Sequence, residues 1–448
     1  MLEHPHRRAL IDELHARPFA DIAAPCDVVF LACKHPENAV GRDRDAERSQ
    51  LADGLAAAGL DSHRLGNNHF LGPIGDSPSA DLLKWEQHSE FTSFALFRRT
   101  IAPEAFAFDQ ARATLEHWAA GITAPVLVKV SLRVEHIPDN SDAMADRLAS
   151  WFNAKSLAAA RILDGAAVLA GDFQLDDHGH MRFALFVPPS CSPARVGQLV
   201  QSVLEIETYR AMSMLGLYRA RKLAKALTDF DQRLEDVVLA MTKADSDHEA
   251  LLFDLLDISS TLEEQAALMT FRFGATEAYN AIVHDRIELL REQRFEGLQT
   301  FHEFMMRRFD PAIRTVNSTQ ERLNSQLNRT TRTAELLRTQ VDVSRSAQSQ
   351  SLLTSMDRRT AVQLRLQRTV EGLSVIAISY YAVNLLAGFL FPLAQAFDLS
   401  KAQLTAALVL PVVILVALLI RRVRLGEGKA EEAKAEEAKD GEAKDGEG

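Results

Sequence analysis

Two long uncharged segments near the C-terminus constrain this chain more than any other feature. The stretch 372–397 holds 26 residues without a charge, and 402–420 holds 19 more. A bilayer core of about 30 Å needs roughly 20 apolar residues in one helix, so each segment is long enough to cross it. We therefore expect a C-terminal hairpin of two transmembrane helices, at about 372–395 and 402–420. Two buried helices of a soluble core are the alternative.

The charges around these segments favour the membrane. Seven arginines flank the outer ends of the pair, whereas the connecting loop has one lysine, Lys401; the arginines are Arg358, Arg359, Arg365, Arg368, Arg421, Arg422 and Arg424. Positive charge resists translocation, so both flanks are expected in the cytoplasm and the loop outside. The first 19 residues contain no apolar run of signal-peptide length. We expect a multi-pass plasma-membrane protein with cytoplasmic N- and C-termini.

The first apolar segment carries a polar stripe. Ser374, Ala377, Tyr381, Asn384 and Gly388 recur at spacings of three and four, so they share one helical face. An amide within hydrocarbon is costly unless it finds a partner. Two interpretations stay open: this face packs helices together, or it lines a polar pathway in an oligomer. Asn384 is the central residue in both.

A long helical stalk is expected before the membrane segments, over 228–370. The stretch 276–369 contains one interior glycine and one proline, Pro311, where we expect a break. Further along, a weak heptad seam alternates spacings of four and three and predicts a partly coiled-coil helix, through Leu323, Leu327, Thr330, Ala334, Leu337, Val341 and Ser344. An isolated polar helix of this length is unstable, so it needs partners from its own chain or from other subunits. We favour self-association and expect a homo-oligomer.

The residues before this stalk, 1–227, are expected to form a cytoplasmic α+β head. Alternation and β-branched content predict strands at 26–33, 93–100, 126–135, 166–175 and 181–188, with the last two joined as a hairpin. Helices are expected at 41–58, 103–120, 141–161 and 193–227. The intermixing of helices and strands favours an α+β sandwich.

Charge and cysteine content exclude several classes of function. Residues 1–306 carry a net charge of −15, which disfavours nucleic-acid binding. The segment 307–368 is basic, with a net charge of +7, and the low-complexity tail within 421–448 is acidic and expected to be disordered. Three scattered cysteines form no C-x-x-C pair, so they support neither a disulfide framework nor a zinc site.

One short motif in the head could carry chemistry. Glu86, His88 and Glu90 occupy alternate positions and would share one face of a strand, as an acid–base or metal site or as a solvated strand face. The histidines near the N-terminus and the polar turn 176–180 are expected to have structural roles. Phosphate-binding, dinucleotide-binding and hydrolase signatures are absent from the sequence, so we expect neither an enzyme nor a cofactor.

Four motifs nevertheless resemble a known group of proteins. They read ELHARPF at 13–19, KWEQHSEF at 84–91, EIETYRAMSMLGL at 205–217 and EGLSVIAISYY at 371–381. Together they are similar to a bacterial family of predicted membrane-anchored proteins of unknown function. The resemblance implies a bacterial inner-membrane location and supplies no catalytic residues. The architecture is also loosely similar to CorA-type divalent-cation channels, although the Gly-Met-Asn signature of those channels is missing here.

Three hypotheses of function follow. The first is a membrane-anchored scaffold or sensor, whose head binds an unidentified cytoplasmic partner. The second is an oligomeric cation channel or transporter with Asn384 facing the pore. The third is an enzyme at the membrane surface that uses His88 with Glu86 or Glu90.

Overall fold

The computed structural model describes residues 3–8, 11, 19–35, 42–77, 79–243, 246–395, 400–420 and 422. The chain divides into two compact units, Met1–Leu337 and Arg338–Gly448. The acidic tail predicted after residue 426 lies outside the described residues, as does most of the ELHARPF motif.

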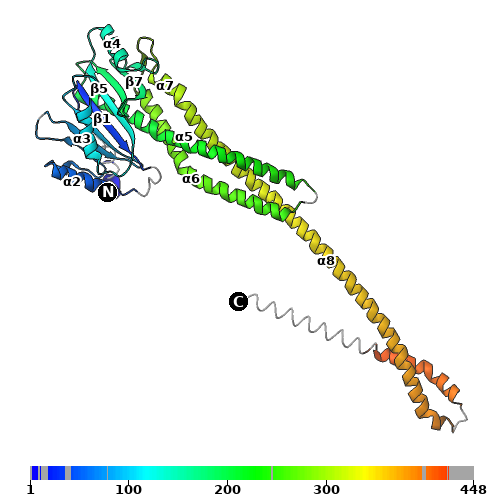
Figure 1. Ribbon diagram of the computed structural model, residues 1–448. Coiled ribbons are helices and arrows are strands. Elements are labelled where there is room, and N and C mark those ends of the chain that lie inside the picture. The colour runs from blue at the N-terminus through cyan, green and yellow to red at the C-terminus, as the bar shows by residue number, and fades with distance from the viewer. Residues whose placement is uncertain are drawn as a thin grey trace. The chain divides into compact units, whose positions relative to one another are not determined.

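A mixed sheet is the centre of the first unit (Figure 1). Its nine strands among the described residues lie in the order β2-β3-β4-β1-β5-β8-β7-β6-β9. Only β5 and β8 pair in parallel within this described sheet; the other neighbours are antiparallel. The strands are β1 Cys26–Cys33, β2 His69–Pro73, β3 Leu82–Gln87, β4 Thr92–Arg98, β5 Val126–His136, β6 Ala158–Ile162, β7 Ala167–Leu175, β8 Met181–Val187 and β9 Gln293–Arg294.

The five predicted strands correspond to β1, β4, β5, β7 and β8, and the predicted hairpin is formed by β7 and β8. The prediction of a helix over 141–161 is wrong in its second half. Helix α4 ends at Trp151, and 158–162 is strand β6, which pairs with β7 on one side and β9 on the other. Alanine favours helices locally, but the alanines of β6 are buried within the sheet, and this tertiary pairing outweighs their propensity.

Helices cover both faces of the sheet. Strand β1 is buried along its whole length: Val28 and Phe30 face one core, whereas Val29 and Leu31 face the other. The second of these cores contains α2 Arg44–Ala57, α3 Asp109–Ala119 and α4 Ser141–Trp151. The first contains the start of α5 Pro193–Met241, the end of α6 His248–Leu289 and α7 Phe301–Arg308. A short 3-10 turn, η1 Ser62–Arg64, precedes β2.

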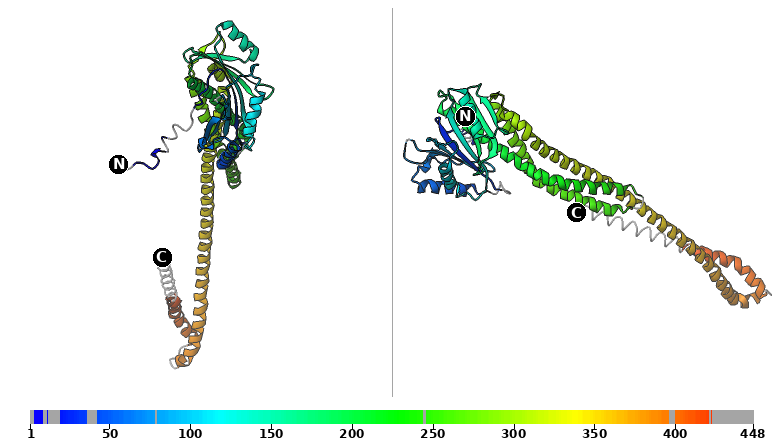
Figure 2. Two further views of the ribbon diagram at one scale, coloured as in Figure 1. Left: turned by 90° about the vertical axis from the view of Figure 1, so that its left-hand side faces the viewer. Right: turned by 45° about the horizontal axis from the view of Figure 1, so that its top comes forward.

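Beyond the sheet, α5, α6 and the first part of α8 Asp310–Gln395 run side by side (Figures 1 and 2). Helix α5 continues through position 227, which we expected to end the head. The three helices share a leucine-rich core that includes Leu227, Leu262, Leu323 and Leu337. The first part of the predicted heptad seam is therefore buried within the same chain, and that stretch is not available for self-association.

The second unit contains an exposed helix and a second apolar helix. Every residue from 342 to 370 of α8 is exposed. Two helices near the C-terminus, the end of α8 and Lys401–Ile420, are long and apolar enough to span a membrane. Among their described residues few side chains are buried, the main ones being Ser379, Val383, Ala387 and Val412.

The contact between α5 and α6 depends on a missing side chain. A Cβ atom on Gly216 would lie 2.2 Å from Oγ1 of the fully buried Thr276, whereas a Cβ on Gly274 of α6 would meet nothing within 4 Å. We expect Gly216→Ala to lower the free energy of unfolding by about 1–3 kcal/mol through overpacking. Gly274→Ala should raise it by about 0.5–1 kcal/mol, since alanine is the better helix former. Denaturant unfolding of the full chain measures the free energy of unfolding of each variant. Equal changes for Gly216→Ala and Gly274→Ala would contradict the close contact at Gly216.

Candidate functional site

A cavity of about 50 Å³ lies between the sheet and α5, at one of the motifs singled out in the sequence. Residues of β1, β3, β4 and α5 line it, and Glu86 and His88 are among them. Phe30, Phe91 and Phe97 give the cavity an apolar side. A space of this size holds a few water molecules or a very small ligand.

A chain of paired polar groups runs along this cavity. The Lys84 ammonium lies 3.1 Å from the Glu86 carboxylate and donates a hydrogen bond of 2.7 Å to Gln201 of α5. Gln201 in turn donates to Glu205 at 2.8 Å, and Glu205 is ion-paired with Arg286 of α6. Lys84 and Glu86 are both buried. Because Lys84 is paired with Glu86 and Glu205 is paired with Arg286, this chain of contacts fixes β3 against α5 and α6.

The structure separates the three residues of the sequence motif. Strand β3 ends at Gln87, and the His88 N–H donates to the Phe91 carbonyl in the turn that follows. The His88 ring stacks on Phe91 with centroids 4.0 Å apart, and its Nε2 lies 3.4 Å from Ser93 Oγ. Glu86 and His88 thus border one cavity, whereas Glu90 does not line it. The expectation that all three share one strand face is wrong, because the chain turns after Gln87.

Glu90 instead belongs to a buried ion cluster between the sheet and α6. It is ion-paired with Arg272, accepts a hydrogen bond of 3.0 Å from Tyr279 and lies 3.5 Å from the Lys34 ammonium. Burial, followed by the charge of Arg272, lowers the pKa of Lys34, and burial raises the pKa of Tyr279. The cluster holds two cations against one carboxylate, so Glu90 is the group on which its stability depends.

The segment before β1 contributes to the lining of the cavity. Ala20 lines the cavity, and the Ile22 N–H donates to the carbonyl of Pro193 at the start of α5. A Cβ atom on Gly197 would lie only 1.8 Å from the Ala20 carbonyl oxygen. This backbone-to-helix approach is possible only with glycine at position 197.

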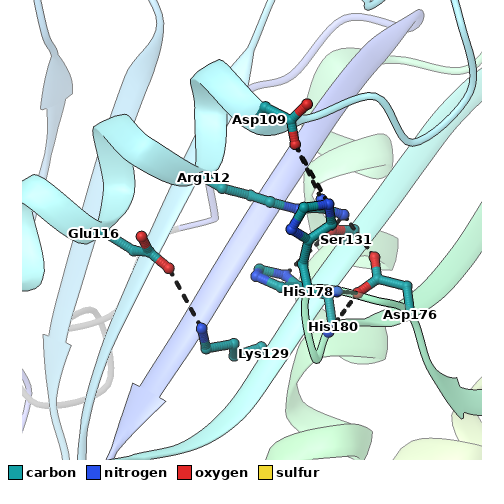
Figure 3. Close-up of polar contacts among 8 residues, drawn as sticks. All are labelled: Asp109, Arg112, Glu116, Lys129, Ser131, Asp176, His178 and His180. Carbon is teal, nitrogen blue, oxygen red and sulfur yellow. Dashed lines mark hydrogen bonds and ion pairs between the residues drawn. The ribbon is translucent and has the colours of Figure 1, made fainter.

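A second polar network, shown in Figure 3, was not predicted from the sequence. Arg112 of α3 donates to Asp176 at 2.7 Å and to Ser131 of β5 at 3.4 Å. Ser131 Oγ lies 3.2 Å from Nδ1 of His180, whose backbone N–H donates to Asp176 at 2.8 Å. The parallel pairing of β5 with β8 brings these residues together, because Ser131 lies beside the residues that open β8.

This network resembles a serine–histidine pair but is closed to substrates. Ser131 and His180 are 0% and 1% exposed. Burial, followed by the charge of Arg112, lowers the pKa of His180 to about 4. Although burial alone would raise the pKa of Asp176, hydrogen bonds from the His180 and His178 backbone and the Arg112 charge hold it below its ordinary value. A nucleophile needs an open approach, so we interpret the network as structural.

The described residues offer neither a cluster of metal ligands nor, at Cys26 and Cys33, a reactive thiol. Within it, no three His, Cys, Asp or Glu side chains are grouped so that they could hold a metal ion. Burial raises the pKa of the Cys33 thiol to about 11 and raises that of Cys26 further. Neither thiol is therefore a ready nucleophile at neutral pH.

The polar face predicted in the first apolar segment lies on the exposed side of α8. Tyr381, Asn384 and Gly388 are exposed, and Ser374 is half-buried. The Asn384 amide donates a hydrogen bond of 3.1 Å to the Tyr380 carbonyl of its own helix. The buried side chains of this segment, Ser379, Val383 and Ala387, lie on a different face.

The Glu90 cluster gives a first prediction for this region. Glu90→Ala leaves Arg272 and Lys34 buried without their carboxylate, so we expect the free energy of unfolding to fall by about 3–5 kcal/mol. The control is Asp257→Ala, which breaks the exposed ion pair with Arg233 at a helical position of α6 and should cost less than about 1 kcal/mol. Denaturant titration compares the two, and similar small losses would show that Glu90 is dispensable.

The lowered pKa of His180 gives a second prediction, which concerns the dependence of stability on pH. The pKa of a histidine in the unfolded chain is about 6.5, whereas that of His180 in the folded chain is about 4. Between these two pH values the unfolded chain binds a proton that the folded chain does not bind. Stability is therefore expected to fall as pH decreases from 6.5 to 4, by up to about 3 kcal/mol. His180→Asn should flatten that part of the profile, whereas His178→Asn in the same turn, at an exposed site, should preserve it. Thermal unfolding between pH 4 and 7 is the measurement.

Comparison with known proteins assigns the chain to a family but gives it no activity. Neither the curated proteins nor the solved structures contain a match. The loose similarity to CorA-type channels therefore gains no support. Residues 2–426, nearly the whole chain, match the family described as "Protein of unknown function (DUF3422)". The chain belongs to this DUF3422 family.

Proposed function

We propose that this protein is an oligomeric scaffold or sensor of the bacterial inner membrane, anchored by two transmembrane helices and facing the cytoplasm. The observation that carries the proposal is the apolar surface of its two candidate membrane helices. Large apolar side chains on both are 60% exposed or more, among them Ile376, Leu385, Phe389, Leu410 and Leu415. Only 17% and 6% of the residues in their most apolar windows are buried.

The energy of this surface favours a bilayer over water. Burying one such side chain stabilises a protein by roughly 1.5–3 kcal/mol. A dozen exposed side chains of this kind would therefore cost on the order of 20 kcal/mol in water, more than the net stability of an ordinary domain. Lipid removes that cost, and the length of each helix matches a hydrocarbon core.

The flanking charges support an orientation for the anchor. The seven arginines lie outside the apolar pair, before its first helix and after its second. With these charges in the cytoplasm, the head and the C-terminal tail lie on the cytoplasmic side, and the loop around Asp398–Lys401 lies on the other.

The chemistry of the head favours binding over catalysis. Its buried titratable groups are engaged in pairs such as Lys84 with Glu86 and Arg272 with Glu90. The serine–histidine pair of Ser131 and His180 is closed to substrates. We therefore propose that the head recognises a cytoplasmic partner and that the membrane helices hold it at the inner surface.

Topology reporters test this proposal. A green fluorescent protein fused after Arg424 should fluoresce, and alkaline phosphatase at the same place should be inactive. Fusions truncated after Ser400 should give the reverse result, with active phosphatase. The full chain should also remain in the membrane pellet after alkaline carbonate extraction. Release by carbonate, or active phosphatase after Arg424, would contradict the anchor or its orientation.

A further inference from the structure

We propose that one continuous face of α8 joins two copies of this chain in parallel, an inference that rests on the membrane anchoring proposed above. The face, here called the α8 seam, consists of Leu352, Met356, Leu366, Val370, Tyr381 and Asn384. It continues the polar stripe of the membrane segment into the part of the helix that precedes it.

Helical geometry places these six residues on one side. At about 100° per residue, their directions fall within a sector of about 80°. Gly388 lies in the same sector, so the seam extends from Leu352 to Gly388, about 54 Å at 1.5 Å per residue. Arg359 and Gln363 also lie in this sector and interrupt its apolar part.

The seam is uncovered in the single chain. Leu352, Met356, Leu366 and Val370 are between 54% and 65% exposed, and Tyr381 is 67% exposed. They belong to a helix that is exposed on all sides from 342 to 370. A single helix of this length without a packed face is marginal in water, so it needs a partner.

The second apolar helix leaves most of the seam uncovered. The side chains of α8 that are buried in this region are Ser379, Val383 and Ala387. Ser379, Val383 and the exposed seam residue Asn384 line a space shared with Thr405, Val409 and Val413 of the helix Lys401–Ile420. Ser379 points about 180° away from Leu352 around the helix. Packing of the two apolar helices against each other therefore leaves the seam open from Leu352 to Tyr381, and Asn384 lies exposed at the edge of the packed face.

The polarity of the α8 seam along its length is matched by a second copy of the same chain. The seam is apolar where the helix lies in water and polar where it lies in lipid, which is the reverse of an ordinary surface in each medium. A partner must therefore change from apolar to polar at the same level relative to the membrane surface. A second α8 that enters the membrane from the same side meets this requirement, because its residues lie beside the identical residues of the first. An amide is both donor and acceptor, so Asn384 can pair with Asn384 of the second copy. Among the described residues, the Asn384 amide donates to the Tyr380 carbonyl of its own helix.

Two leucines provide a matched test. Leu366 lies on the seam, whereas Leu364, two residues before it, points about 160° away from Leu366 and about 120° away from Leu352. Both are exposed. Leu366→Cys and Leu364→Cys would each be made in full-length chain carrying Cys191→Ser; Cys26 and Cys33 are buried. Inner-membrane vesicles would then be oxidised with copper phenanthroline, and the disulfide-linked dimer would be measured on non-reducing gels.

The seam requires Leu366→Cys to form at least about tenfold more dimer than Leu364→Cys, because a disulfide needs Cβ atoms within about 4 Å. Adding Asn384→Leu should lower the Leu366→Cys dimer by roughly threefold or more. Equal cross-linking at both positions, or none at either, would overturn the seam. Recovery of the chain in the soluble fraction would instead contradict the proposed anchor, because the seam is tested only on chain that sediments with the membranes.

Discussion

Helix α5 is the element on which the rest of the structure depends. The first half of its 49 residues buries Val196, Val200 and Val203 against the sheet. Its second half buries Leu223, Leu227 and Leu234 against α6 and α8. One rigid helix therefore belongs to two cores, and the sheet cannot shift without moving the helical bundle. The glycines at 197 and 216 permit its closest contacts, with the Ala20 backbone and with Thr276.

Charged residues strengthen the same junction. Lys84 and Glu86 are linked through Gln201 to α5, and Glu90 is paired with Arg272 of α6. A buried ion pair adds little net stability over an apolar contact, but breaking it is costly, so such pairs specify which surfaces meet. The motif KWEQHSEF is best understood in this way. Its acidic groups Glu86 and Glu90 pair with cations and so hold the sheet to its helices.

The long helix α8 has two parts with different surroundings. Up to Leu337 its apolar side packs on α5 and α6 within the chain. From residue 342 onward its side chains are exposed, although apolar residues continue to recur along it. A helix that is covered first by its own chain and then by a second copy would couple the fold of each head to assembly.

The sequence by itself determined the local elements whose signals are strong. Continuous β-branched and apolar runs predicted β1, β5 and β8, and the two uncharged segments predicted helices long enough for a membrane, because these patterns depend only on neighbouring residues. The tertiary structure decided what depends on distant residues. It made 158–162 a strand despite its alanines, and it buried Leu323 and Leu337 within the chain instead of between chains. It also joined Ser131, His180 and Arg112, and it parted Glu90 from Glu86. Burial and partner choice are properties of the whole packed chain, and spacing along the sequence does not encode them.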